Sequence, residues 1–163
     1  MNWNLMKNII IVIVGALIVF FVISKVGRDT PSPVVEDPGV SVPTEIELTS
    51  LRGVKIYVTM PNETEGITSP LVVKGRAPGN WFFEASAPVV LTNWDGLIIG
   101  QKYITAEGEW MTTDYVPFSG EIVFETPICE ADYCKRGSLI LQKDNPSGES
   151  QFDDAVEMTI KFK

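Results

Sequence analysis

Ala155–Phe162 reads AVEMTIKF, and its side chains alternate between apolar and polar at each step. The apolar set is Val156, Met158, Ile160 and Phe162, and the polar set is Glu157, Thr159 and Lys161. Successive side chains of a β-strand point to opposite faces of a sheet, so this alternation predicts a strand with one buried face. Such a strand needs a second apolar layer to cover it, which indicates two packed sheets.

Further short runs of this kind precede the last strand and are separated by Gly, Pro, Asn and Asp. The expected strands are Val54–Met60, Ser69–Ala77, a kinked run over Trp81–Ala85 and Pro88–Asn93, Leu97–Thr105, Tyr115–Glu125 and Gly137–Lys143. About seven strands with regularly spaced turns, and no convincing helix among them, predict an all-β fold. The fold class that fits is an immunoglobulin-like antiparallel β-sandwich.

A different pattern occupies the N-terminal end of the sequence. Ile9 to Ile23 are fifteen consecutive residues without a polar side chain. A helix in a bilayer satisfies all of its backbone groups internally, so this run predicts one N-terminal transmembrane helix. A cleaved signal peptide is an alternative, although Val22–Val26 lacks small residues at a cleavage site. A buried core helix is a second alternative, but the run shows no amphipathic stripe.

These patterns divide the chain into three parts. Residues 1–28 are the expected transmembrane anchor, residues 29–50 are a proline-rich extracytoplasmic linker, and residues 51–163 form the sandwich domain. Lys7 precedes the apolar run and Lys25 and Arg28 follow it, so the basic flanks are nearly balanced. The acidic, cysteine-containing remainder favours export. We therefore expect a single-pass membrane protein with its C-terminal domain outside the cytoplasm.

The charge of the chain is strongly asymmetric. Residues 1–28 hold three basic and no acidic residues, whereas the remainder holds ten basic and twenty-one acidic residues, a net charge of −11. A domain of this sign repels nucleic acid, so no nucleic-acid partner is expected. The sequence contains no histidine, which removes the commonest general base and most zinc sites. No cofactor and no metal site are predicted.

Several motifs together resemble a known family. These motifs are Ile56–Pro61 (IYVTMP), Ser69–Ala77 (SPLVVKGRA), Trp81–Ala85 (WFFEA), Asn93–Gly96 (NWDG), Pro117–Phe124 (PFSGEIVF) and Gly137–Leu141 (GSLIL). Their order and spacing are similar to the immunoglobulin-like domain of bacterial spore germination proteins, over roughly Val54–Phe162. The resemblance implies an interaction domain of the bacterial envelope and carries over no catalytic residues. The chain departs from that pattern in a longer insertion, Ile128–Arg136.

This insertion holds both cysteines, Cys129 and Cys134, in the sequence C-E-A-D-Y-C. Two cysteines without a histidine cannot complete a four-ligand zinc site within one chain, and the spacing is not the C-x-x-C of a redox motif. In an exported domain, a local disulfide between them is expected. It would rigidify an acidic loop.

Three tryptophans are candidates for a contact with a partner or a sugar. Trp81 stands beside Phe82 and Phe83 in a strand-like run, which favours core packing. Trp94 occupies the predicted Asn93–Gly96 hairpin, where exposure is expected, and it is the candidate contact residue. Trp110 is the third.

The function expected from the sequence is a non-enzymatic, membrane-tethered interaction domain that binds another protein of the cell envelope. A module that binds cell wall or polysaccharide through exposed aromatic side chains is the alternative. An enzyme is a third reading, in which Glu84, Glu107 or Glu109 supplies a carboxylate pair for glycoside hydrolysis. With twenty-one acidic residues, some must lie close together in any fold, so this signal is weak.

Overall fold

The structure is a computed structural model that describes residues 44–62 and 64–163. The predicted anchor Ile9–Ile23 and most of the predicted linker lie outside these residues. Within the part that is described, none of the helices is both long and apolar enough to cross a membrane.

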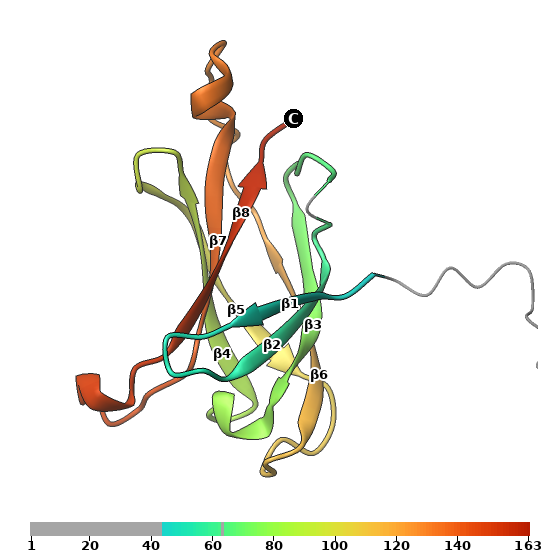
Figure 1. Ribbon diagram of the computed structural model, residues 1–163, viewed down its shortest axis with the longest axis vertical. Helices are drawn as coiled ribbons and strands as arrows, with labels where there is room; N and C mark the ends of the chain where they lie inside the picture. Colours follow the sequence, from blue (N-terminus) through green and yellow to red (C-terminus); the bar gives the residue numbers. More distant parts are fainter. Residues whose placement is uncertain (1–43, 63) are drawn as a thin grey trace, which may run out of the picture. The chain divides into compact units, whose positions relative to one another are not determined.

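Eight β-strands and three short 3-10 turns form the described part of the chain (Figure 1). The strands are β1 (Ile46–Thr49), β2 (Lys55–Met60), β3 (Leu71–Pro78), β4 (Ser86–Asn93), β5 (Ile98–Ala106), β6 (Tyr115–Ile122), β7 (Arg136–Gln142) and β8 (Ala155–Lys161). The turns are η1 (Gly79–Trp81), η2 (Asp132–Lys135) and η3 (Ser150–Phe152). The prediction of an all-β fold is therefore confirmed for the described residues.

The strands form one hydrogen-bonded antiparallel sheet in the order β1-β2-β3-β6-β5-β4-β7-β8. It folds over into two layers, β1-β2-β3-β6 and β5-β4-β7-β8. The layers join where Thr105 pairs with Ser119 and Ala106 pairs with Phe118. Pairing of β3 with β6, and of β4 with β7, is the Greek-key arrangement of immunoglobulin sandwiches. The expected two-sheet sandwich of about seven strands thus appears as two layers of one continuous hydrogen-bonded sheet of eight strands.

The core lies between the two layers and is built from alternating side chains. Val156, Met158 and Ile160 of β8, and Phe162 directly after it, are all buried, as the alternation of AVEMTIKF predicts. Two aromatic pairs contribute to the same core. Phe82 packs against Phe118 with ring centroids 6.2 Å apart, and Phe124 packs against Phe162 at 5.8 Å. Burial of this apolar surface is the main stabilising term.

Two segments differ from the strand prediction. Ile46–Thr49 forms β1, within the range expected to be linker, because its backbone pairs with β2 in register from Ile46↔Val58 to Thr49↔Lys55. Trp81–Ala85 is not a strand. Phe83 and Ser86 exchange backbone hydrogen bonds of 3.0 Å around Glu84 and Ala85, which have φ of 49° and 60°. Two positive φ values make a hairpin turn of the primed type, which normally carries Gly or Asn, so the sequence gives no sign of it.

A buried carboxylate connects the β1–β2 turn to the start of β8. The Ser50 hydroxyl donates to Asp154 Oδ2 at 2.7 Å, and both side chains are buried. The backbone N–H groups of Arg52 and Ala155 donate to Asp154 Oδ1 at 3.2 and 3.0 Å. Ser50 Oγ in turn accepts from the N–H of Val54 at 3.0 Å. This network holds together two ends of the sheet that are far apart in sequence.

Candidate functional site

The β6–β7 connection is closed by the predicted disulfide between Cys129 and Cys134, whose Cα atoms are 6.0 Å apart. η2 lies in this connection and ends where β7 begins. Cys134 is buried, whereas its neighbour Tyr133 is 63% exposed. The loop therefore presents an aromatic ring to solvent from a position fixed by a covalent bond. Figure 1 shows it in orange at the top of the domain, on the same side as the β4–β5 hairpin.

The β4–β5 hairpin places Trp94 at this end of the sandwich. Asn93 and Leu97 close the turn through a backbone bond of 2.9 Å, and the Asn93 side chain accepts a second bond from the Leu97 N–H at 2.8 Å. Gly96 has φ of 83°, the conformation that the Asp95–Gly96 pair predicts. Trp94 is 52% exposed, in agreement with the expectation from sequence.

Trp94 and Tyr133 contact each other. Their ring centroids are 5.2 Å apart and the rings are nearly perpendicular, at 83°. The contact forms because β4 pairs with β7 as far as Asn93↔Gly137, which brings the hairpin and the disulfide loop together. The structure thus unites Trp94 with the two cysteines, which the sequence singled out separately. Tyr133 was missed, and only its place inside the disulfide loop could have indicated it.

Three further exposed apolar side chains lie on or next to these two loops: Leu97 at 64%, Ile98, the first residue of β5, at 55%, and Ile128 fully. We call Trp94, Leu97, Ile98, Ile128 and Tyr133 the loop-end surface. Large apolar side chains gathered on neighbouring loops are typical of sites that contact another molecule. Edge-to-face aromatic rings combine a large contact area with a fixed geometry.

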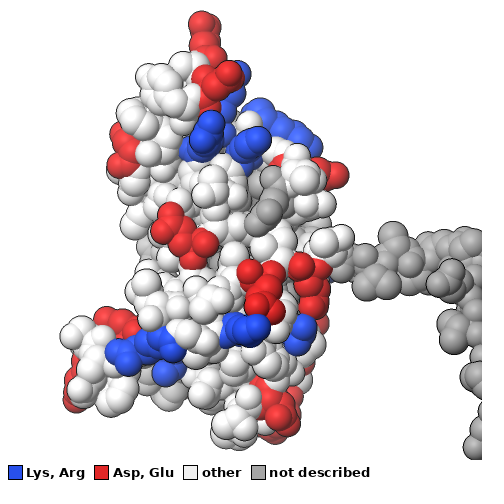
Figure 2. Space-filling view, in the orientation of Figure 1, with Lys and Arg blue, Asp and Glu red and all other residues white. Residues whose placement is uncertain are grey.

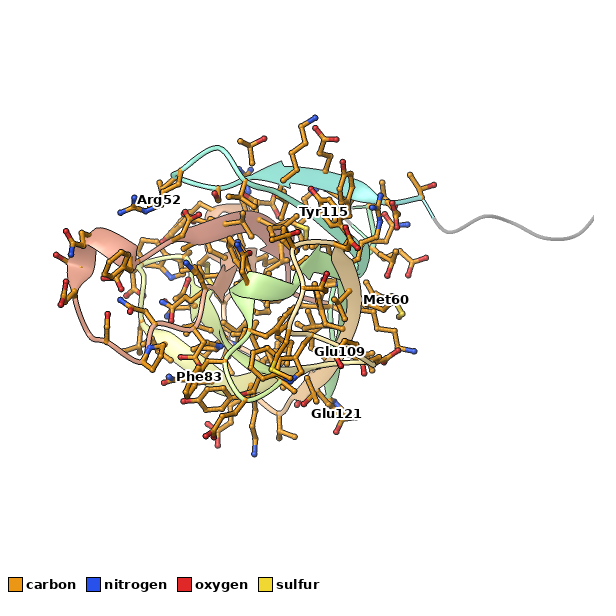
Figure 3. The ribbon with its side chains drawn as sticks, turned by 90° about the horizontal axis from the view of Figure 1, so that it is seen from below. Arg52, Met60, Phe83, Glu109, Tyr115 and Glu121 are labelled. Carbon is orange, nitrogen blue, oxygen red and sulfur yellow. A yellow bond between two sulfur atoms is a disulfide. The ribbon has the colours of Figure 1, made fainter. Side chains whose placement is uncertain are left out.

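A second cluster lies on the outer face of the β1-β2-β3-β6 layer, around Arg76. The Arg76 guanidinium lies 3.7 Å from the ring centroid of Tyr57 and 5.1 Å from that of Tyr115. Glu45 accepts three hydrogen bonds from it: Nε donates to Oε1 at 3.1 Å and to Oε2 at 3.2 Å, and a terminal nitrogen donates to Oε2 at 2.8 Å. Figure 3 shows Tyr115 next to the β1–β2 hairpin, and its hydroxyl donates to the Lys55 carbonyl oxygen at 3.1 Å. The Arg76 cluster therefore holds β1 against its layer.

The ionisable side chains of this cluster shift one another's pKa values. The hydrogen bond from Arg76 lowers the pKa of Glu45, and the one from Lys55, at 2.8 Å, lowers the pKa of Glu47. Desolvation raises the pKa of Tyr57, and its hydrogen bond with Glu47 adds to this effect. Because each of these carboxylates has a cation as its partner, the cluster provides no free base or nucleophile. It stabilises the first strand.

We predict that Arg76→Gln will loosen β1. Loss of an exposed ion pair and of stacking on two tyrosines, each about 0.5–1 kcal/mol, makes opening of β1 about tenfold more frequent. Hydrogen exchange at the amides of β1, corrected for intrinsic rates, measures this change. Lys74→Gln is the matched control, because Lys74 lies exposed on the same strand and makes no ion pair within residues 44–62 and 64–163.

Acid is expected to act on the same contacts. Both carboxyls have a folded-state pKa below the ordinary value of 4.5, so their stabilisation is complete above that pH. It is lost as the pH falls through the lowered folded-state values. Corrected exchange of β1 should therefore rise below pH 4.5 in the native chain, and less so in Arg76→Gln. An equal rise in both proteins would contradict this role of Arg76.

The remaining candidates from the sequence do not form a site. Trp81 is buried, as expected, and Trp110 packs partly buried against the core. Glu84 is exposed on the turn before β4, whereas Glu107 and Glu109 lie on the β5–β6 connection. Within the described ranges, no group of three or more Cys, Asp and Glu side chains is arranged to hold a metal ion.

Comparison with known proteins identifies the family. Residues 55–146 match the immunoglobulin-like domain of bacterial spore germination, from β2 through β7 into the loop that follows. No curated protein matches the chain, and no solved structure does. The family is not a known enzyme family. Because the match spans more than half of the 163 residues and covers both loops of the loop-end surface, the chain belongs to the family of immunoglobulin-like domains of bacterial spore germination.

Proposed function

We propose that this chain is a non-enzymatic interaction module, tethered to a membrane by Ile9–Ile23 with its domain outside the cytoplasm, that binds another protein of the bacterial envelope. The observation that carries the proposal is the exposed Trp94–Tyr133 pair at the loop end, with ring centroids 5.2 Å apart. Aromatic side chains of this kind supply most of the binding free energy at many protein interfaces.

Rigidity at the loop end supports the proposal. Ordering a flexible loop on binding costs free energy, about 0.5–1.5 kcal/mol for each immobilised side chain. Here the disulfide constrains the backbone on either side of Tyr133, and the Asn93 side chain holds the turn that carries Trp94. Part of the ordering cost is thus met during folding, which leaves more of the contact energy for a partner.

The chemistry of the chain supports a binding role rather than catalysis. Both cysteines are joined in the disulfide, so neither is a nucleophile. Without histidine, a serine has no imidazole base to activate it. Tethering also favours binding, because a membrane anchor raises the local concentration of the domain near partners in the same envelope.

The test is site-specific photo-crosslinking of the full chain in bacterial cells, with a photoreactive residue in place of Leu97. One discrete adduct with a single envelope protein is expected, and Trp94→Ala should reduce its yield about tenfold, since truncation of a hot-spot aromatic costs about 2 kcal/mol. Phe152→Ala is the control, because Phe152 is 49% exposed on η3, away from both loops. Absence of any protein adduct would remove the proposal.

The aromatic pair also fits a second candidate function, binding to a wall polysaccharide, because aromatic rings stack on the apolar faces of sugars. Purified full chain in detergent, mixed with purified wall material, separates the two functions. If the native chain and Phe152→Ala sediment with the wall material but Trp94→Ala does not, the result would favour polysaccharide binding. If the native chain stays in the supernatant, binding to a protein partner remains as the proposed function.

A further inference from the structure

Basic side chains gather beside the loop-end surface, although the chain as a whole carries a net charge of −8. Arg136, the first residue of β7, lies directly opposite Lys161, the last residue of β8. Like charges at facing positions of an antiparallel pair are destabilising. Lys135 precedes Arg136 in η2, so three cations lie within two adjacent chain segments. Figure 2 shows this basic group at the top of the domain, where β7 begins and β8 ends.

These cations line a shallow pocket of about 310 Å³, together with Asp132 and Phe162. Asp132 approaches Lys135 at 3.7 Å, but its own side chain is 98% exposed, so this ion pair is weak. Arg136 and Lys161 make no ion pair with any residue in 44–62 or 64–163. Asp132 is therefore the acidic residue of the pocket lining, and it forms an ion pair with neither of the two facing cations.

The pocket adjoins the two loops that carry the aromatic pair, through the start of β7 and through η2. Arg136 directly precedes Gly137, which pairs with Asn93, the residue before Trp94. Tyr133 lies in η2 together with Lys135. The residues that line the pocket and those that carry the two rings thus lie on the same or neighbouring segments, η2, the start of β7 and the β4–β5 hairpin.

We propose that this pocket receives a carboxylate from an acidic segment of the protein partner, while an apolar neighbour in that segment covers Trp94 and Tyr133. This inference rests on the proposed function and names the chemistry of the partner. The planar guanidinium of Arg136 can take a carboxylate through two parallel hydrogen bonds, and Lys161 adds a second charge. An acid bound there relieves the repulsion between the facing cations.

A uniformly charged wall polymer fits this site less well than a single carboxylate. Asp132 lines the pocket itself, Glu130 lies two residues before it in the disulfide loop, and the chain as a whole is acidic. An extended polyanion that continued past these carboxylates would meet repulsion, since exposed charges interact over about 8–10 Å at physiological salt before they are screened. A local acid within an otherwise neutral, apolar segment avoids this repulsion.

The test is charge reversal in the photo-crosslinking experiment with the full chain. Arg136→Glu is expected to reduce the yield of the Leu97-position adduct about tenfold, with a smaller loss in Arg136→Lys. The reversal places a carboxylate opposite Lys161, which replaces a repulsion with an attraction, so loss of fold is not expected and the thermal midpoint should not fall. Lys102→Glu, an equal change of charge on the exposed part of β5, is the control.

The outcomes separate this inference from the proposed function. No adduct in the native chain would remove both. An adduct that depends on Trp94 but is unchanged in Arg136→Glu would overturn the acidic-segment inference alone, as would an equal loss in Lys102→Glu. A third outcome is that the native chain binds anionic wall polymer and Arg136→Glu does not, while the yield of the protein adduct is unchanged. This outcome would assign the pocket to the polymer and overturn the inference.

Discussion

Asp154→Ala is expected to lower the free energy of unfolding by about 3 kcal/mol. The substitution leaves the buried Ser50 hydroxyl and the N–H groups of Arg52 and Ala155 without their acceptor. Hydrogen bonds to a charged group contribute about 1.5–3 kcal/mol each, and an unsatisfied buried donor costs about 1–3 kcal/mol. Denaturant unfolding of the full chain in detergent, followed by tryptophan fluorescence, measures the change.

Asp153→Ala is the matched control for that experiment. The neighbouring carboxylate is exposed and accepts one side-chain hydrogen bond, from Asn145 at 2.7 Å. An exposed contact of this kind contributes within about 0.5 kcal/mol. Similar losses in the two variants would show that the Asp154 network does not hold the β1–β2 turn to β8.

Gly137→Ala is expected to have the second large effect, a loss of about 3 kcal/mol together with separation of the loop-end surface. A methyl group at this position would overlap the carbonyl oxygen of Thr92 and lie 2.9 Å from the ring of Phe162. The Thr92 carbonyl belongs to the backbone of β4 and cannot rotate away as the end of a flexible side chain can, so β4 and β7 must move apart. Overpacking of this kind lowers the free energy of unfolding by about 1–3 kcal/mol or more. Denaturant unfolding gives the stability.

The same variant reports on the site. If β4–β7 pairing holds Trp94 against Tyr133, Gly137→Ala should also red-shift the emission of Trp94 and weaken the photo-adduct. Gly96→Ala is the control, since a methyl group there meets nothing within 4 Å and only the positive φ costs energy, about 1 kcal/mol. A smaller loss in Gly137→Ala than in Gly96→Ala would contradict the close approach of the two strands.

Most of the strands could be predicted because their sequence signals are local. The alternation in AVEMTIKF depends only on which side chains prefer water, and it located β8 to within one residue. β1 was missed because IELT is only four residues long and supplies just two alternating apolar side chains, Ile46 and Leu48, neither of which is fully buried. β1 is a strand because it pairs with β2, and four residues of sequence do not contain enough information to predict that pairing.

The site was predicted only in part, for a related reason. The Asp95–Gly96 turn indicated that Trp94 is exposed, and the paired cysteines indicated a constrained loop. That these two features meet depends on the register of β4 against β7, residues that are distant in sequence. The Arg76 cluster has the same origin: Glu47, Tyr57 and Arg76 follow one another across three strands, and only the register aligns them.

The Arg76 cluster is also expected to set the order in which the domain yields to mechanical force. A pull through the chain before Thr44 acts first on the ion pair of Glu45 with Arg76. It then opens the β1–β2 hairpin from its free end, one residue pair of Ile46–Thr49 at a time. The buried contact of Ser50 with Asp154 is the next point of resistance. Moderate tension would therefore lengthen the molecule by releasing β1, while the sandwich and its loop-end surface stay folded.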